Sequence, residues 1–448
     1  MLVLLNAITG GVNMFTCKTL SDLHQTMERI GVCLPLSSEY GALRRPLTVA
    51  GRTLLNRIAI QPMEGCDSAP DGAPGELTIR RYDRFARSGA ALIWFEACAV
   101  RREGRANPRQ SFLTSDNLDD FRCLTERIRE TAVQSGHEPP LLILQATHSG
   151  RYSKPDGVPA PVIACNNPLF EKDAPLPASC IISDDALFRL EDDFAQTARL
   201  AQAAGFDGVD IKCCHRYLTS ELLSAFTRPG AFGGSFENRT RLLRESYGKA
   251  KAVVTGDFLV TSRLNVYDGF PYPYGFGVQD DGSLAPDLTE PIRLVGELQK
   301  LGLELLDVTI GNPYVNPHVN RPADWQPYPL PEEPLQGLAR MMDCVSGIKR
   351  AFPSLSVIGS AFSYPRAFAG NLAAGAIEAG VCDLAGFGRM AFAYPDFADD
   401  LLSGRGLDAR KCCVACGKCS QLMRLGGMAG CAVRDPYYTR LYKELTSK

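Results

Sequence analysis

Short apolar runs alternate along this chain with longer segments in which apolar residues recur at helical spacing. Amphipathic stretches such as 193–204, 291–301 and 335–352 separate the runs, which favours parallel strand pairing. Eight units of this kind over roughly 330 residues predict a TIM (β/α)8 barrel. The predicted strands are 58–61, 91–95, 141–145, 208–211, 258–262, 304–309, 356–359 and 383–386.

Three regions follow from this pattern: residues 1–55 as an extension and barrel plug, 56–405 as the barrel, and 406–448 as a cysteine-rich segment. We interpret 1–13 as a disordered leader, with an alternative start at Met14, and 14–55 as helical and then irregular. Loops 266–288 and 311–334 are long enough to be lids. Their aromatic residues, Tyr267, Phe270, Tyr272, Tyr274 and Trp325, predict a bulky, flat, apolar substrate.

Composition narrows the class of protein. The chain has 448 residues, 45% of them hydrophobic, so it can bury a large core. A net charge of -2 does not favour binding to nucleic acid or to an anionic membrane surface. No run approaches the roughly 18 apolar residues that span a bilayer. Sixteen cysteines without a secretion signal favour the reducing cytoplasm. The sequence leaves the oligomeric state open.

Reactive side chains gather in residues 205–218, GFDGVDIKCCHRYL. A helix end and a short buried strand are followed by Lys212, His215 and Tyr217. An amine, an imidazole and a phenol within six residues form a proton-handling set, which makes these the candidate catalytic residues. The alternative is an ordinary strand that runs into a polar loop.

This segment resembles a motif of the old yellow enzyme family, the NADH:flavin oxidoreductases: D-G-V-E-I-H, two residues, His or Asn, then G-Y-L. Lys212 stands at the first family His, His215 at the second polar position, and Tyr217 at the tyrosine. Residues 228–241, RPGAFGGSFENRTR, resemble the family's R-x-D-x-Y-G-G-S-x-x-N-R-x-R. In that stretch Gly230 and Phe232 replace the Asp and Tyr.

The resemblance implies an FMN cofactor. It places the backbone of Pro62, Met63 and Glu64 along the flavin and the Gln145 amide on the pyrimidine edge. Arg263 would face flavin N1 and O2, where a cation stabilises the anionic reduced flavin. The phosphate would lie between the turns after the last two strands, at a helix N-terminus. The residues expected there are Ala361, Phe362, Gly388 and Arg389.

A second motif lies beyond the barrel, where Cys413, Cys416 and Cys419 are followed after eleven residues by Cys431. Thiols at this spacing can hold one [4Fe–4S] cluster. Structural zinc is the alternative, and Cys412 offers a second register. The motif resembles the iron–sulfur branch of the family, with 2,4-dienoyl-CoA reductases, enoate reductases and trimethylamine dehydrogenase. Those relatives carry C-terminal nucleotide-binding domains that this sequence lacks, so either NAD(P)H docks on the flavin or a separate protein donates electrons.

The resemblance implies an ene-reductase that hydrogenates the C=C bond of an α,β-unsaturated carbonyl compound. Hydride would come from flavin N5 and the proton from Tyr217, while Lys212 and His215 would hold the substrate oxygen. The alternative is an amine dehydrogenase or demethylase of the trimethylamine dehydrogenase type, although Lys212 opposes a cationic amine. A third hypothesis, a non-catalytic electron-transfer subunit, leaves the proton-handling set unexplained.

Overall fold

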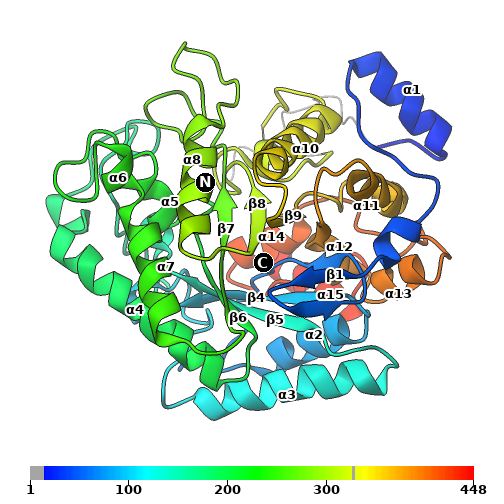
Figure 1. Cartoon of the computed structure of the whole chain (residues 1–448), viewed down its shortest axis with the longest axis horizontal. Helices are drawn as coiled ribbons and strands as arrows, with labels where there is room; N and C mark the ends of the chain where they lie inside the picture. Colours follow the sequence, from blue (N-terminus) through cyan, green and yellow to red (C-terminus); the bar gives the residue numbers. More distant parts are fainter. Residues whose placement is uncertain (1–14, 325–327, 448) are drawn as a thin grey trace.

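The computed structural model describes residues 15–324 and 328–447; the predicted leader 1–13, Met14 and the lid residue Trp325 lie outside them. Eight parallel strands close into a barrel in the order β10-β3-β4-β5-β6-β7-β8-β9 (Figure 1). The TIM barrel prediction is confirmed, and each predicted strand overlaps an observed one. The strands are β3 (Ile58–Ile60), β4 (Leu92–Ala99), β5 (Leu141–Thr147), β6 (Gly208–Ile211), β7 (Leu259–Asn265), β8 (Leu305–Thr309), β9 (Ser356–Gly359) and β10 (Leu384–Phe387).

The barrel strands are buried along their whole length because helices cover the barrel from outside. The covering helices are α2 (Glu76–Ala86), α3 (Leu118–Gln134), α4 (Asp184–Ala203), α7 (Arg241–Val253), α8 (Thr289–Lys300), α10 (Pro334–Ala351) and α11 (Ala369–Glu378). Shorter helices lie in the connections: α5 (Leu218–Leu222), α6 (Phe236–Arg239), α9 (Pro317–Asn320), α12 (Arg389–Ala393) and α13 (Phe397–Leu402).

A hairpin that the sequence pattern does not predict closes the amino end of the barrel. It pairs β1 (Leu47–Val49) with β2 (Arg52–Leu54) through Ala50 and Gly51, both of which have positive φ. Two such residues form the kind of tight turn that matches strand twist. Val49 and Leu54 pack against the first inward-facing residues of the barrel strands. The predicted helix in residues 14–55 is α1 (Leu20–Ile30).

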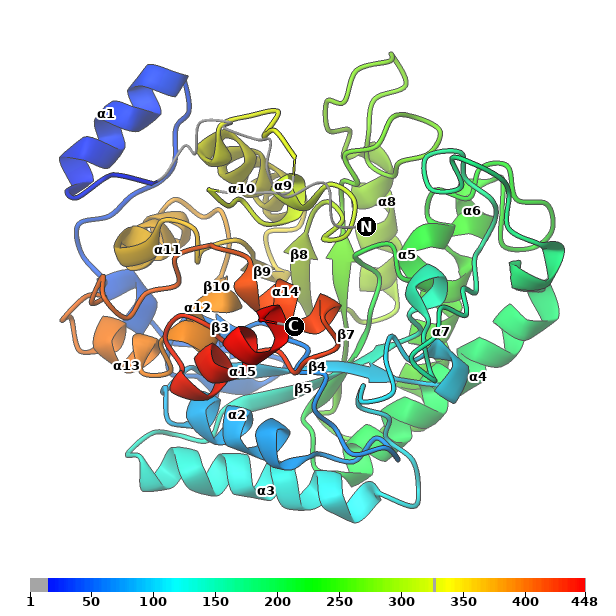
Figure 2. The same ribbon diagram turned by 180° about the vertical axis from the view of Figure 1, so that it is seen from behind.

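The cysteine-rich segment folds back across the carboxyl end of the barrel, where α14 (Lys418–Arg424) and α15 (Pro436–Thr446) lie over the strands (Figure 2). The Ala429 amide donates to the Gly65 carbonyl oxygen at 2.7 Å. The Asp435 carboxylate accepts hydrogen bonds from Arg80, at 2.9 Å, and from Arg84, at 2.5 Å, both on α2. These contacts fix the segment to the barrel end that carries chemistry in this fold.

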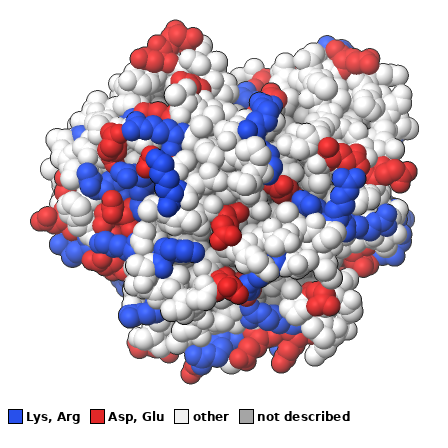
Figure 3. Space-filling model, in the orientation of Figure 1, with Lys and Arg blue, Asp and Glu red and all other residues white. Residues whose placement is uncertain are grey.

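On the face of the molecule seen in Figure 3, the described residues form no basic patch of the kind that binds nucleic acid. Basic and acidic side chains are intermixed on the face seen in Figure 3, without a field of one sign. None of the helices within the described residues is both long enough and apolar enough to cross a membrane.

Candidate active site

A cavity that encloses about 860 Å³ opens at the carboxyl end of the barrel. Its wall brings together side chains from seven of the eight barrel strands or the loops that follow them, together with the C-terminal segment. Nine of the predicted flavin and catalytic residues lie on this wall: Pro62, Met63, Glu64, Gln145, Lys212, His215, Tyr217, Arg263 and Arg389. In this fold the active site lies at the carboxyl ends of the strands, so residues from several strands and loops meet there.

The loop after β6 adopts a backbone conformation that side chains of L-residues disfavour. His215 has φ 63° and Arg216 has φ 57°. Strain of this kind persists only where the surroundings enforce it, and it gathers at functional sites. Nε2 of His215 is buried and has no hydrogen-bond partner. Burial lowers the pKa of His215 well below its usual value, and the charges of Arg263 and Lys212 lower it further, so the imidazole is neutral.

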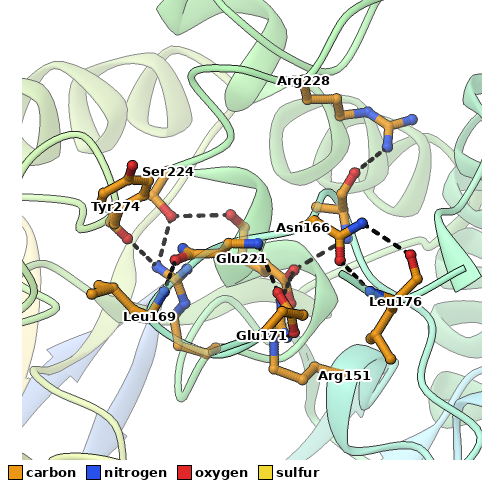
Figure 4. Close-up of polar contacts among 12 residues, drawn as sticks. Arg151, Asn166, Leu169, Glu171, Leu176, Glu221, Ser224, Arg228 and Tyr274 are labelled. Atoms are coloured by element: carbon orange, nitrogen blue, oxygen red, sulfur yellow. Dashed lines mark hydrogen bonds and ion pairs between the residues drawn. The ribbon is translucent and has the colours of Figure 1, made fainter. Parts of the chain in front are cut away.

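Arg216 enforces this conformation and was not singled out by the sequence. Its Nη1 donates to Ser224 Oγ at 2.7 Å, to Asp268 Oδ2 at 2.9 Å and to the Tyr274 carbonyl oxygen at 2.9 Å. Figure 4 shows Ser224 and Tyr274 in this network, beside the ion pair of Arg151 with Glu221 at 2.8 Å. Because Arg216 lies between His215 and Tyr217, its buried contacts hold both of their positions.

The first lid therefore has a different role from the predicted one. Tyr267, Phe270, Tyr272 and Tyr274 are not among the described residues that line the cavity. Instead, the Phe270 ring packs on the Arg216 guanidinium at 5.5 Å, and the backbone of Tyr274 accepts its hydrogen bond. The second lid does reach the cavity, through Pro313, Tyr314 and Arg321.

Lys212, Tyr217 and Tyr314 line the cavity close to one another, and Tyr152 packs against this group from the side. The Tyr217 and Tyr314 hydroxyl oxygens are 2.9 Å apart, and the Tyr152 and Tyr314 ring centroids are 4.0 Å apart. Lys212 Nζ lies 3.8 Å from the centroid of the Tyr217 ring. Burial lowers the pKa of Lys212 and raises that of Tyr217, so the phenol holds its proton firmly. A phenol that retains its proton at neutral pH can serve as a general acid.

Behind these groups, two buried aspartates orient the expected flavin ligands. Asp210 accepts from Gln145 Nε2 at 2.7 Å, which leaves the amide oxygen of Gln145 available to a ligand. Asp307 Oδ2 lies 3.0 Å from Arg263 Nε, and its Oδ1 accepts from Gln61. Burial raises the pKa of Asp210 to about 7 and that of Asp307 to about 6.

The far end of the cavity is cationic. Arg321, Arg389 and Arg424 line it, and none of them forms an ion pair within the described residues. Arg321 donates to Ser420 Oγ at 2.6 Å, and Arg389 donates to the Pro322 carbonyl oxygen at 3.2 Å. Burial lowers the pKa of Arg321 to about 10, and repulsion from Arg389 adds to this effect. Unpaired guanidinium groups held close together fit an anion such as a phosphate.

The other predicted phosphate residues lie behind this wall. Phe362 is fully buried, with its ring packed on Phe387 at 5.8 Å, and Ala361 has φ 71°. A Cβ on Gly388 would lie 2.8 Å from Met63 Sδ, so glycine permits close packing there. Arg321 and Arg424, which the sequence did not indicate, line the cavity where Ala361, Phe362 and Gly388 were expected. Together, the Gln145 amide, the Arg263 cation and the arginine group fit FMN.

A second cavity, enclosing about 1490 Å³, adjoins the first. The two share Glu64, Tyr314, Met423 and Arg424 as common wall residues. Its further lining includes Cys66, Asn107, Arg109, Tyr152 and Lys154. Arg109 and Lys154 form no ion pair with any described residue, so the electrostatic potential of this cavity favours anions.

Cys413, Cys416, Cys419 and Cys431 line a third, smaller cavity of about 360 Å³ beneath α14. Cys412 is not among its lining residues, since its thiol donates to the Asp408 carbonyl oxygen at 3.3 Å. Cys419 belongs to the walls of both this cavity and the first one. The described residues contain no group of three or more His, Cys, Asp or Glu arranged around a single metal ion.

A profile of the NADH:flavin oxidoreductase / NADH oxidase family matches residues 42–276, just over half of the chain. The chain belongs to this family. It is thus a flavin-dependent oxidoreductase, for which the family supports FMN as cofactor and NAD(P)H as reductant. The NADPH dehydrogenase of Bacillus subtilis (strain 168) is 29% identical over 272 residues, which cover 59% of this chain and 72% of that protein.

Solved structures share the fold. A 2-naphthoyl-CoA reductase in complex with 2-naphthoyl-CoA superposes with a TM-score of 0.72 at 20% identity, over 90% of this chain and 58% of that one. Histamine dehydrogenase from Rhizobium sp. 4-9 gives a TM-score of 0.67 at 19% identity, over 90% of this chain and 53% of that one. The chain therefore spans little more than half the length of these two proteins.

Proposed function

We propose that this enzyme is an FMN-dependent ene-reductase that hydrogenates the activated C=C bond of an α,β-unsaturated carbonyl compound. The observation that carries the proposal is that Lys212, His215 and Tyr217 line one cavity together with Gln145 and Arg263. An acid, an oxygen-binding pair and flavin-binding groups are thereby within reach of one substrate. Amine oxidation needs no such acid, and the Lys212 cation disfavours an amine substrate.

Each residue has a defined task in this reaction. FMN, held by Gln145, Arg263 and the arginine group of Arg321 and Arg389, would supply hydride to the β-carbon. Lys212 and His215 bind the carbonyl oxygen and stabilise the negative charge that develops on it. Tyr217 gives its phenolic proton to the α-carbon. The rings of Tyr152 and Tyr314, whose centroids are 4.0 Å apart, form an apolar wall beside the acid.

The second cavity supports a bulky substrate with an anionic part. Its space adjoins Tyr314 and Glu64, beside the reacting groups, and it carries the unpaired cations Arg109 and Lys154. A flat, apolar reacting end would lie among the tyrosines, while a carboxylate or phosphate on the remainder would meet the cations. The prediction of a large substrate is therefore supported by this second cavity. The aromatic residues of the first lid do not support it, because they do not line the first cavity.

The four clustered cysteines support membership of the iron–sulfur branch. Cys413, Cys416, Cys419 and Cys431 line one small cavity together, and their close spacing in the sequence is the spacing that iron–sulfur clusters use. Such a cluster would exchange single electrons with a donor. A separate reduced protein would be that donor, whereas NAD(P)H would instead give its hydride to the flavin directly.

An anaerobic half-reaction experiment tests the activity. Enzyme reduced with dithionite is mixed with enones and enoates, with and without an anionic substituent, while flavin absorbance is followed. Oxidised enzyme is mixed with secondary and tertiary amines in parallel. We expect rapid reoxidation by the unsaturated compounds, fastest with the anionic ones, and no reduction by amines. Flavin reduction by an amine, with no reoxidation by any enone, would refute the proposal.

A further inference from the structure

Glu64 lies at the boundary between two cavities of different character. It lines the first cavity, beside Tyr217 and Lys212, and also the second cavity, beside Asn107. Asn107 Nδ2 donates toward its Oε1 at 3.4 Å. The residue therefore connects the enclosed site of the reacting groups with a much larger space that can hold water.

Charged and titratable groups face Glu64 from several elements. They are Lys212, Tyr217, Tyr314, Cys66, Arg81 and Glu96. Burial raises the pKa of Glu64, whereas the Lys212 charge, the hydrogen bond with Tyr217 and the Arg81 charge each lower it. Burial is the largest of these effects, so the carboxyl group retains its proton to a higher pH than an exposed glutamate.

Tyr217 needs a source of protons if it donates one in every catalytic cycle. Its side chain is only 2% exposed, so bulk water does not reach it directly. The Lys212 ammonium lies over the face of its ring, at 3.8 Å from the centroid, and not at the hydroxyl. Tyr314 is in contact with the hydroxyl and also lines the second cavity, but its pKa is raised, so it is a weaker acid than a carboxyl group. Glu64 is the carboxylic acid among the described residues that line both cavities.

We propose that Glu64 reprotonates Tyr217 after each turnover and that Glu64 is itself reprotonated through water in the second cavity. This inference rests on the proposed ene-reductase function. In each cycle the Tyr217 O–H bond breaks as the α-carbon C–H bond forms, which leaves a phenolate. The Glu64 carboxyl then gives its proton to the phenolate, and a solvent proton that water in the second cavity relays protonates the resulting carboxylate. One hydride and one proton are thus added to the substrate, and Glu64 acts only through Tyr217.

Comparison of one turnover with many turnovers tests this role. In a single reoxidation, Tyr217 uses the proton that it already holds, so Glu64→Gln should proceed within about twofold of the wild-type rate. In steady state, Tyr217 must be reprotonated after each turnover, so the turnover rate of Glu64→Gln should be lower by about 10- to 100-fold. Tyr217→Phe should already be slow in the single turnover. Glu126→Gln, on the exposed face of α3, is the matched control and should be normal in both assays.

The pH profile and a spectroscopic readout separate a proton source from a structural role. Wild-type steady-state turnover should fall as pH rises through the raised pKa of Glu64. Glu64→Asp should show the same decrease with pH, and Glu64→Gln should not show it. Infrared difference spectra of substrate-free enzyme should show a protonated carboxyl band that persists to a higher pH than that of an exposed glutamate and that Glu64→Gln removes. Wild-type steady-state rates in Glu64→Gln would overturn the inference alone, whereas failure of every enone to reoxidise wild-type enzyme would refute the underlying function.

Discussion

The ammonium nitrogen of Lys212 lies 3.8 Å from the centroid of the Tyr217 ring, a cation–π contact between the two proposed catalytic groups. In a desolvated site such a contact contributes on the order of 2 kcal/mol. It holds the phenol in place while leaving its hydroxyl free to face Tyr314 and the substrate. The two residues thus support each other's position and yet perform different tasks.

Replacement of Tyr217 by Phe should separate proton donation from every other step. The ring and its contact with Lys212 remain, so flavin content and flavin reduction should be unchanged. Reoxidation by an unsaturated substrate should slow by a factor of roughly 10² to 10⁴, as expected for loss of a general acid. Stopped-flow absorbance of the flavin measures this rate.

Two further variants serve as controls for Tyr217→Phe. Tyr314→Phe removes only the hydrogen-bond partner of the phenol and should slow reoxidation less. Lys212→Ala removes an oxygen contact, so both substrate binding and the hydride step should suffer. If Tyr217→Phe reoxidises at the wild-type rate while Lys212→Ala is inactive, the lysine or a water molecule is the acid.

The cationic end of the first cavity should determine the affinity for the FMN phosphate. Arg321→Ala and Arg389→Ala each remove a charge-assisted hydrogen bond, which corresponds to about 1.5–3 kcal/mol or about a 10- to 100-fold weaker FMN complex. Fluorescence titration of the flavin-free protein measures this. Arg405→Ala, which affects an exposed pair with Asp399, is the control. Riboflavin, which lacks the phosphate, should bind all four proteins equally; selective loss of riboflavin binding would contradict the assignment.

The two neighbouring cysteines should differ in their effect on iron content. Protein prepared without oxygen should carry about four irons per chain, and Cys413→Ser should lose them because its thiol lines the cavity. Cys412→Ser should retain them, since the Cys412 thiol points to the Asp408 carbonyl oxygen. Iron analysis and visible absorbance provide the readout. Equal iron loss in both variants, or zinc in place of iron, would count against the cluster.

Buried Asp210 should make stability depend on pH in an unusual direction. Its pKa is about 7 in the folded protein and near the ordinary aspartate value of 3.8 in the unfolded chain, so between these pH values the folded state binds more protons. The free energy of unfolding should therefore fall as pH rises from about 4 to about 7, by up to about 1.4 kcal/mol per pH unit for this group. Asp210→Asn should flatten the slope by that amount in chemical denaturation. An unchanged slope would show that Asp210 is ionised in the folded state.

The sequence predicts the barrel well because parallel strands covered on both faces are continuous apolar runs. It misses the hairpin of β1 and β2, whose strands have three residues each and whose turn uses Ala50 in place of the usual Asn. It also misses Arg321, since a proline-rich loop has no periodicity from which an inward side can be read. The same lack of periodicity explains why the sequence does not reveal that Phe270 of the first lid packs on Arg216 and not on the substrate cavity.

Docking of residues 406–448 on the barrel has a consequence for the order of events during biosynthesis. The barrel strands leave the ribosome before Cys419, Ser420, Met423, Arg424 and Ala429, which complete the wall of the first cavity. The nascent barrel therefore has an incomplete cavity until this segment has been made and has docked. We expect the tightest FMN binding only after that step, and bound flavin then protects the folded form from proteolysis.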